Sequence, residues 1–188
     1  MNKNLCVPFI GFTTKNITQQ WSNEHKAFDI ARETPELSWG TWLVAMENCI
    51  VENTMGGDVL EDSGWELDRG YGILLRSITN PEVKYSYWHT LSSFPVKKGD
   101  TVLQGKPVCQ MGNSGYCVSN GRVITKEEKL KGSKLGTHCH LSCTEDTIDR
   151  IDFNIKVNFD LLTTISLTLF SISNFLSLKL LKEQKHEI

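Results

Sequence analysis

Two histidines near the end of the well-patterned part of the chain carry its strongest chemical signal. His138 and His140 stand one residue apart within Gly136-Thr137-His138-Cys139-His140-Leu141. Side chains alternate between the two faces of a β-strand, so such a pair projects from one face of a strand. A helix would set the two side chains about 200° apart. The spacing therefore predicts a strand that presents two imidazoles side by side.

A second group of residues has the spacing of metal ligands. His25 and Asp29 are four residues apart, which puts both on one face of either a strand or a helical turn. A catalytic zinc site takes three protein ligands and leaves a position for water. His140 could supply the third ligand, giving a His2Asp set for Zn2+. Bound zinc lowers the pKa of its water to about 7, which makes a nucleophile available at neutral pH.

Two further histidines could assist such a water. His138, on the same strand face as His140, would lie close enough to take a proton from it. His89 ends a strongly β-like run and could donate a hydrogen bond to a developing oxyanion. The fifth histidine, His186, lies in a charged tail, and we interpret it as a solvated bystander. The three expected ligands with His138 and His89 beside them predict a site for amide hydrolysis.

Short strands separated by turn signals must position these residues. Expected strands and strand pairs cover 41–51, 71–78, 83–91, 101–103 and 107–111. The turn signal Asn80-Pro81 predicts that 71–78 and 83–91 form a hairpin. Gly112–Gly115 is a loop that follows 107–111. The segments 52–68 and 116–135 are polar, and we expect long loops there. The pattern predicts a mainly β fold, an antiparallel sandwich or barrel-like core.

The order and surroundings of these pieces resemble the lysostaphin-type zinc metalloendopeptidases, which cut peptidoglycan. The resemblance runs from about Phe9 to Ser142 and rests on seven segments in family order: His25–Ala31, Gly40-Thr41, Gly70–Gly72, Tyr87–Ser92, Val96–Asp100, Gly112–Gly115 and Gly136–His140. It implies that His25, Asp29 and His140 bind zinc. It further implies that His138 is the catalytic base and that His89 stabilises the transition state.

Two departures from the family pattern stand out. Family members have a glycine-containing turn inside the first motif, where this chain has Ala27-Phe28. The loop before the histidine pair is short in the family, whereas the 116–135 segment has about twenty residues. Loops of this kind wall the substrate cleft in the family, so the longer loop bears on substrate preference and leaves the metal site intact.

Composition agrees with a globular protein and excludes one class of partner. The 188 residues are 39% apolar and 22% charged, with a net charge of −2. Neither this charge nor the lysines of the 116–135 segment makes a basic footprint, so we expect no nucleic-acid partner. The six cysteines have irregular spacing without a Cys-x-x-Cys pair. We interpret them as reduced and structural, with a disulfide framework as the alternative.

The chain divides into a predicted metalloendopeptidase domain, 1–150, and a C-terminal extension, 151–188. Apolar residues at helical spacing between Leu161 and Leu180 predict an amphipathic helix that packs on the domain or on a partner; a membrane anchor is the alternative. The N-terminus lacks the features of a secretory signal. We therefore expect an enzyme acting on the cell wall, periplasmic or extracellular, delivered by a phage, a virion or lysis.

Two other functions compete with this one. A non-catalytic regulatory or binding domain on the same scaffold would lack some of the zinc ligands, whereas all five expected positions are filled here. A phosphocarrier of the sugar-transport system also pairs histidines across a cleft, but its chemistry leaves no purpose for His25 and Asp29. The sequence thus favours a zinc endopeptidase, a lysin, with peptidoglycan peptides as substrate.

Overall fold

The protein is described by a computed structural model that covers residues 5–22, 24–56 and 69–145. Within these ranges, three short helices lie among the strands: η1 (Thr14–Asn16), α1 (Pro35–Ser38) and α2 (Lys126–Leu130). The strands are β1 (Ile17–Gln19), β2 (Phe28–Ile30), β3 (Trp42–Val44), β4 (Cys49–Met55), β5 (Tyr71–Ser77), β6 (Val83–Thr90), β7 (Thr101–Val102), β8 (Pro107–Gln110), β9 (Val118–Ser119), β10 (Arg122–Val123) and β11 (Cys139–Glu145).

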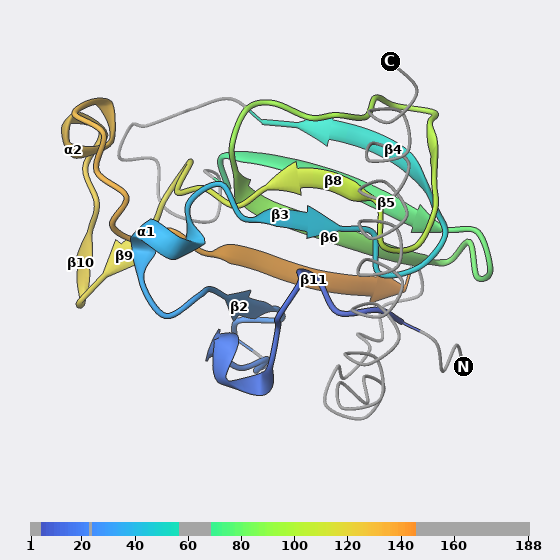
Figure 1. Ribbon diagram of the computed structural model, residues 1–188, viewed down its shortest axis with the longest axis horizontal. Helices are drawn as coiled ribbons and strands as arrows, with labels where there is room; N and C mark the ends of the chain where they lie inside the picture. Colours follow the sequence, from blue (N-terminus) through green and yellow to red (C-terminus); the bar gives the residue numbers. More distant parts are fainter. Residues whose placement is uncertain (1–4, 23, 57–68, 146–188) are drawn as a thin grey trace, which may run out of the picture. The chain divides into compact units, whose positions relative to one another are not determined.

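Seven of these strands form one large sheet in the order β1-β2-β11-β6-β5-β4-β7 (Figure 1). Every pairing in it is antiparallel. Strand β11 lies inside the sheet, between β2 from the beginning of the chain and β6 from the middle. The sheet therefore brings together segments that are far apart in the sequence.

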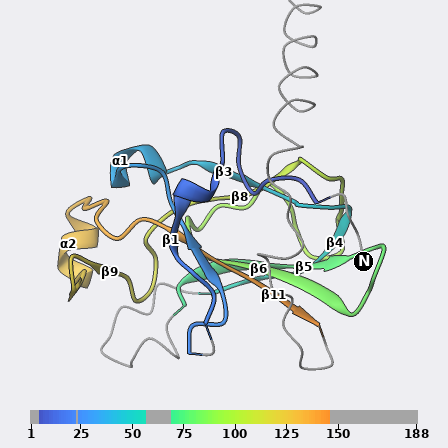
Figure 2. The ribbon, with the colours of Figure 1, turned by 90° about the horizontal axis from the view of Figure 1, so that it is seen from below.

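Strands β3 and β8 form a second, two-stranded layer over one face of the large sheet (Figure 2). Fully buried residues of both layers, among them Leu43, Ile73 and Leu75, make up the core. The layers also share a polar contact, since the Tyr87 hydroxyl donates a hydrogen bond of 2.9 Å to the carbonyl oxygen of Val44. The expectation of a mainly β fold with an antiparallel, sandwich-like core is confirmed.

The predicted hairpin around Asn80-Pro81 is present. Strands β5 and β6 pair directly, and the Asn80 carbonyl accepts a hydrogen bond from the Val83 amide across the turn. Along β6 the side chains of Val83, Tyr85 and Tyr87 are buried while those between them are partly exposed. This alternation places one face of β6 on the core and leaves the other for the site.

Three of the expectations for local structure were wrong. Residues 52–55, expected in a loop, are in β4. The 41–51 stretch holds two strands, but they do not pair with each other: β3 pairs with β8, whereas β4 pairs with β5 and β7. The 116–135 segment is not a plain loop, because it contains the hairpin β9–β10 and helix α2. The sequence signal for helix α2 is a capping box. The Thr125 hydroxyl accepts a hydrogen bond from the Glu128 amide, and the Glu128 carboxylate accepts one from the Thr125 amide.

Other expectations fall partly or wholly outside the described residues. The extension 151–188, with the helix predicted between Leu161 and Leu180, is among them, so it stays a prediction. Among residues 5–22, 24–56 and 69–145, no helix is long and apolar enough to cross a membrane. All six cysteines are within these ranges and none forms a disulfide.

Candidate metal centre and its groove

The centre of the site is a pair of residues that face each other across two strands. Asp29 of β2 and His140 of β11 are directly opposite in the antiparallel ladder. Side chains of opposite residues lie on the same face of a sheet. The distance between Asp29 Oδ1 and His140 Nδ1 is 3.1 Å. Their neighbours Phe28, Ile30 and Cys139 point into the core, so Asp29 and His140 project from the outer face of the sheet.

His25 reaches the same carboxylate from the turn before β2. The turn is closed by hydrogen bonds from the amides of His25 and Lys26 to Ser22, and Lys26 has a positive φ of 44°. This geometry sets His25 Nε2 at 3.1 Å from Asp29 Oδ1. The three ligand atoms of His25, Asp29 and His140 lie within 4.8 Å of one another. The structure therefore gathers a group that could hold a metal ion.

Electrostatics keep this group charged when no metal neutralises it. Burial works to raise the pKa of Asp29, but hydrogen bonds from His140 and His25 outweigh it and hold that pKa well below its ordinary value. The hydrogen bond to Asp29 raises the pKa of His25. An ionised carboxylate between two imidazoles is a donor set suited to a divalent cation such as zinc.

His138 lies beside the group without joining it. It precedes β11, and an isolated bridge pairs it with Gly112. Its Nδ1 lies 2.8 Å from the Gly136 carbonyl oxygen, which can only accept, so Nδ1 carries the proton. The other nitrogen, Nε2, lies 3.7 Å from Asp29 Oδ2. In the neutral ring this Nε2 presents a lone pair toward the site.

His89 enters the site because β6 is irregular there. Tyr71 of β5 is opposite Thr90 and Gly72 is opposite Trp88, so His89 is the extra residue of a β-bulge, with a positive φ of 60°. Strict alternation would place His89 on the core face with Tyr87. The bulge instead brings its ring to 4.6 Å from the His138 ring and 6.1 Å from the His140 ring, centroid to centroid.

The His89 ring is held by the loop after β8. Its Nδ1 lies 2.8 Å from the Ser114 carbonyl oxygen. Burial, and next the neighbouring His138, lower the pKa of His89 well below its ordinary value. His89 is therefore neutral, with Nδ1 donating and Nε2 free to accept. The structure thus brings together all five residues singled out from the sequence, while His186 lies outside the described residues.

Comparison with known proteins identifies solved structures that share this architecture. No family model matches the sequence, and no curated protein matches it. Among solved structures, Csd3 of Helicobacter pylori matches with 17% identity and a TM-score of 0.51, over 82% of this chain and 33% of the Csd3 chain. A chain of the SpoIIIAH–SpoIIQ complex matches with 16% identity and a TM-score of 0.50, over 81% and 99%.

The catalytic domain of the antimicrobial peptidase lysostaphin from Staphylococcus simulans matches with 19% identity and a TM-score of 0.44, over 66% of this chain and 70% of that domain. This chain shares its fold with Csd3 and with the matched chain of the SpoIIIAH–SpoIIQ complex. The fold agrees with the lysostaphin-type resemblance seen in the sequence. At such identities the likeness establishes the fold alone, and this chain spans a third of Csd3.

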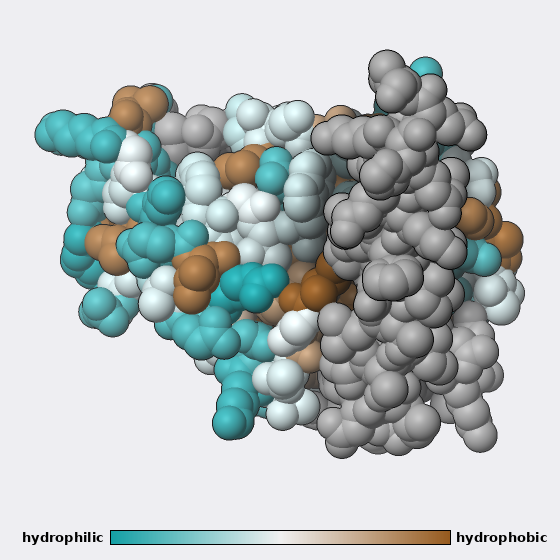
Figure 3. Space-filling model, viewed as in Figure 1, coloured by the Kyte–Doolittle hydropathy of each residue, from teal (hydrophilic) through white to brown (hydrophobic). Residues whose placement is uncertain are grey.

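The five residues open into a groove of about 1010 Å³. One wall comes from Thr18, Gln19, Ser22 and Glu24, and a second from residues 31–35 and Ser38 around α1. A third comes from Tyr116 and residues 118–121 at the start of the long segment. The surface over α1, α2 and the β9–β10 hairpin is mostly hydrophilic, with separate hydrophobic spots (Figure 3).

Sequence reasoning missed the groups that hold the two flanking imidazoles. The Ser114 and Gly136 carbonyls were not singled out, because a backbone acceptor leaves no signature in residue type. Asn113 was noted only as part of a turn, yet it is buried and donates hydrogen bonds to Ser133 and Leu135. A buried amide inside a loop motif is a signal that could have marked it.

Proposed function

We propose that this chain is a zinc-dependent endopeptidase that hydrolyses peptide bonds in peptidoglycan stem peptides or cross-bridges. The observation that carries the proposal is the cluster of His25, Asp29 and His140 in an open groove, with His138 and His89 beside it. Such a substrate places the enzyme at the cell wall, on the periplasmic or extracellular side. Delivery by a phage, a virion or lysis belongs to the same proposal.

The donor set fits zinc. Two imidazole nitrogens and one carboxylate oxygen, His25 Nε2, His140 Nδ1 and Asp29 Oδ1, would hold the ion. Zinc bound there would supply Lewis acidity, lowering the pKa of water to about 7 and polarising the scissile carbonyl. The ladder between β2 and β11 keeps Asp29 and His140 at their spacing.

His138 is the proposed general base. Because its Nδ1 proton is committed to the Gly136 carbonyl, the neutral ring has only Nε2 available to accept a proton. That atom faces the metal ligands and can take the proton of the attacking water. It can then return this proton to the departing amine, which restores the neutral ring.

His89 is proposed to stabilise the oxyanion. Its neutral ring also presents an Nε2 lone pair, because Nδ1 donates to Ser114. His89 must therefore take up a proton from solvent at Nε2 before it can donate to the oxygen. Burial opposes this protonation in the free protein, whereas the negative charge developing on the substrate favours it.

The test combines metal analysis with digestion of purified sacculi. The wild-type protein should contain one zinc per chain and release peptide fragments. His138→Ala should keep its zinc and lose activity by about 10²- to 10⁴-fold. His186→Ala, in the charged tail, is the matched control and should behave as the wild type. Absence of zinc, or unchanged release by His138→Ala, would contradict the proposal.

A non-catalytic binding domain is the second candidate. It is favoured by the likeness to a chain of the SpoIIIAH–SpoIIQ complex, a structure of two proteins bound together. The same metal analysis separates the candidates, because a folded protein that takes up no zinc supports the binding domain. The complete donor set in the groove favours the enzyme.

A further inference from the structure

The 116–135 segment begins and ends beside the two flanking histidines. Ser114, whose carbonyl accepts from His89 Nδ1, lies two residues before it. Gly136, whose carbonyl accepts from His138 Nδ1, follows it directly. Both acceptors are 2.8 Å from the ring nitrogen. Any movement of one end of the segment relative to the other would therefore change the orientation of the His89 ring relative to the His138 ring.

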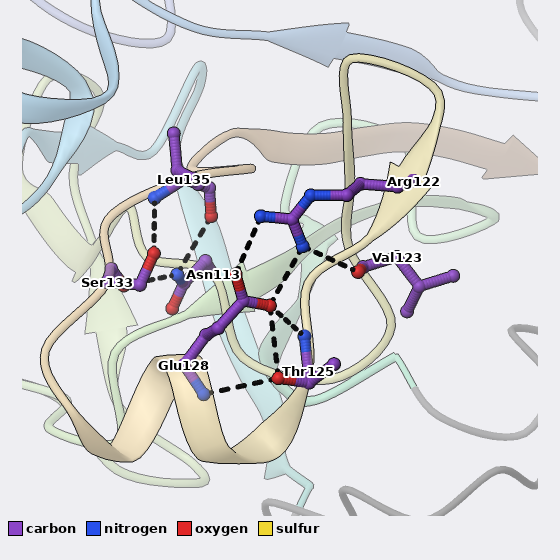
Figure 4. Close-up of polar contacts among 7 residues, drawn as sticks. All are labelled: Asn113, Arg122, Val123, Thr125, Glu128, Ser133 and Leu135. Atoms are coloured by element: carbon purple, nitrogen blue, oxygen red, sulfur yellow. Dashed lines mark hydrogen bonds and ion pairs between the residues drawn. The ribbon is translucent and has the colours of Figure 1, made fainter.

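The segment has a folded structure of its own (Figure 4). The Glu128 carboxylate accepts from both Arg122 guanidinium nitrogens, at 2.9 and 2.6 Å, and from the Thr125 amide at 3.0 Å. Ile124 is buried, and its amide donates to the Cys117 carbonyl. These contacts join the β9–β10 hairpin to helix α2, so the segment can transmit a constraint from one end to the other.

Two side chains tie this structure to the Gly112–Gly115 loop. The Asn113 side-chain amide donates to the Ser133 carbonyl at 2.9 Å and to the Leu135 carbonyl at 3.0 Å (Figure 4). Both acceptors are carbonyls, so both amide protons are used. The Lys129 ammonium of α2 donates to the Gly115 carbonyl. One tie thus spans the two ends, and the other fastens the helix beside Ser114.

We propose that Lys129 and Asn113 are positioning residues, which clamp the 116–135 segment so that Ser114 and Gly136 hold His89 and His138 with Nε2 turned into the groove. The inference rests on the proposed function for its catalytic meaning. An imidazole donating through Nδ1 has its tautomer and its ring direction set by that acceptor. Misplacing a reacting group by about 1 Å can lower a rate about 10²-fold, so the clamp bears on turnover.

The metal ligands do not depend on this clamp. Asp29 and His140 are held by the β2–β11 ladder, and His25 by the turn at Ser22. Loosening the clamp should therefore alter His89 and His138 while the ligand set stays in place. This separation gives the inference a readout that general unfolding would not reproduce.

The test uses Lys129→Met in the full chain, loaded with zinc. Methionine keeps an apolar stem and removes the ammonium. Lys129→Arg restores a donor. Lys131→Met is the matched control, because Lys131 directly follows the same helix and its ammonium donates to the exposed Glu127 carboxylate. The readouts are zinc content, ¹⁵N spectra of the imidazole tautomers, and kcat and KM on sacculi.

We expect Lys129→Met to keep its zinc and its KM, to lower kcat about tenfold and to shift the His89 ring signals away from the pure Nδ1–H form. Lys129→Arg should recover most of the wild-type kcat and most of the wild-type ring signals. Lys131→Met should match the wild type. Asn113→Asp, which removes both donors, should give the same pattern more strongly. Unchanged ring signals in Lys129→Met and Asn113→Asp would overturn the inference.

The outcome is separable from that of the proposed function. If wild-type protein releases no fragments from sacculi, the proposed function fails, yet the ring signals still decide whether the clamp sets the tautomers. If the wild type is active and Lys129→Met changes neither spectra nor kcat, the clamp fails and the proposed function stands.

Discussion

Asp29 Oδ1 lies 3.1 Å from His140 Nδ1 although 111 residues separate the two in the chain. They are opposite partners in the β2–β11 ladder, so the spacing of two ligand atoms is set by backbone hydrogen bonds. Backbone pairing holds Cβ atoms of opposite residues about 5 Å apart whatever occupies the groove. The candidate metal centre is therefore preorganised by the sheet itself.

Replacing the central carboxylate should remove the metal. Asp29→Asn keeps the shape of the side chain but loses the anionic ligand that both His25 and His140 contact. Because altering groups outside the ligand shell already costs about 10- to 100-fold in affinity, we expect losing a ligand to weaken zinc binding by at least about 100-fold. A competition titration with a coloured chelator measures this.

Glu24→Gln is the matched control for Asp29→Asn. Glu24 also lines the groove, but its carboxylate is fully exposed and hydrogen-bonds to Ser22. This variant should bind zinc as the wild type does. Equal zinc affinity in Asp29→Asn and the wild type would show that the ion binds elsewhere.

The positive φ of His89 predicts that glycine is more stable than alanine at this position, the reverse of the usual order in a strand. At φ 60° an L-residue is in the left-handed region, which costs about 1 to 2 kcal/mol and costs glycine little. His89→Gly should therefore be more stable than His89→Ala, by about 1 kcal/mol. Both should keep zinc and lose activity.

Urea unfolding of the two His89 variants gives the comparison. Ser86, in the regular part of β6, supplies the control pair. There Ser86→Gly should be less stable than Ser86→Ala, because glycine in an ordinary strand position loses more conformational freedom. If His89→Ala were more stable than His89→Gly, backbone strain at this position would be ruled out.

The contact between Asp29 and His25 should stabilise the metal-free protein only within a window of pH. The pKa of Asp29 is held below its ordinary value of 3.8, so its contribution is present above about pH 4 and is lost as the pH falls toward the lowered pKa. The pKa of His25 is raised above 6.5, so its contribution is present below 6.5 and is lost as the pH rises through the raised pKa.

Unfolding in urea with EDTA, measured against pH, tests this window. The difference in the free energy of unfolding between the wild type and Asp29→Asn should fall on both sides of it. His89, whose pKa is lowered by burial, adds to both proteins a stability that is lost as the pH falls below 6.5. Zinc should reverse the trend on the alkaline side, because protons compete with the metal for His25. A metal-free protein whose stability keeps rising above pH 7 would contradict the expected protonation of His25.

Gly70→Ala should disturb the support of His89. A Cβ at this position would lie 2.4 Å from the carbonyl carbon of Ser114, and the backbone has a φ of 66°. We expect the fold to lose more than about 1 kcal/mol, and the Ser114 carbonyl to shift away from His89. Activity should fall while zinc is retained.

Gly105→Ala separates the two effects of that change. Gly105 has a similar φ of 78°, but a Cβ there would meet no atom within 4 Å. It should show the loss of stability from backbone strain without the loss of activity. Equal activity in the two alanine variants, measured on sacculi, would show that the contact with Ser114 does not matter.

Local patterns in the sequence were enough to predict much of the fold and of the site. Alternating Val83, Tyr85 and Tyr87 predicted β6, and Asn80-Pro81 predicted its turn, because hairpins join neighbours in the chain. The His-x-His spacing placed two imidazoles on one face for the same local reason. A strand's period and a turn's residue types depend on a few adjacent residues, which the sequence displays directly.

Only the tertiary structure decided which strands are partners and how each ring is turned. Pairing and register depend on contacts between distant segments, so β3 could not be assigned to β8, nor Asp29 set opposite His140, from spacing alone. The bulge that turns His89 out of the core arises from a mismatch between two strands. The carbonyls of Ser114 and Gly136 have no residue-type signature. By itself the sequence determined the residues capable of the chemistry, and long-range packing decided their geometry.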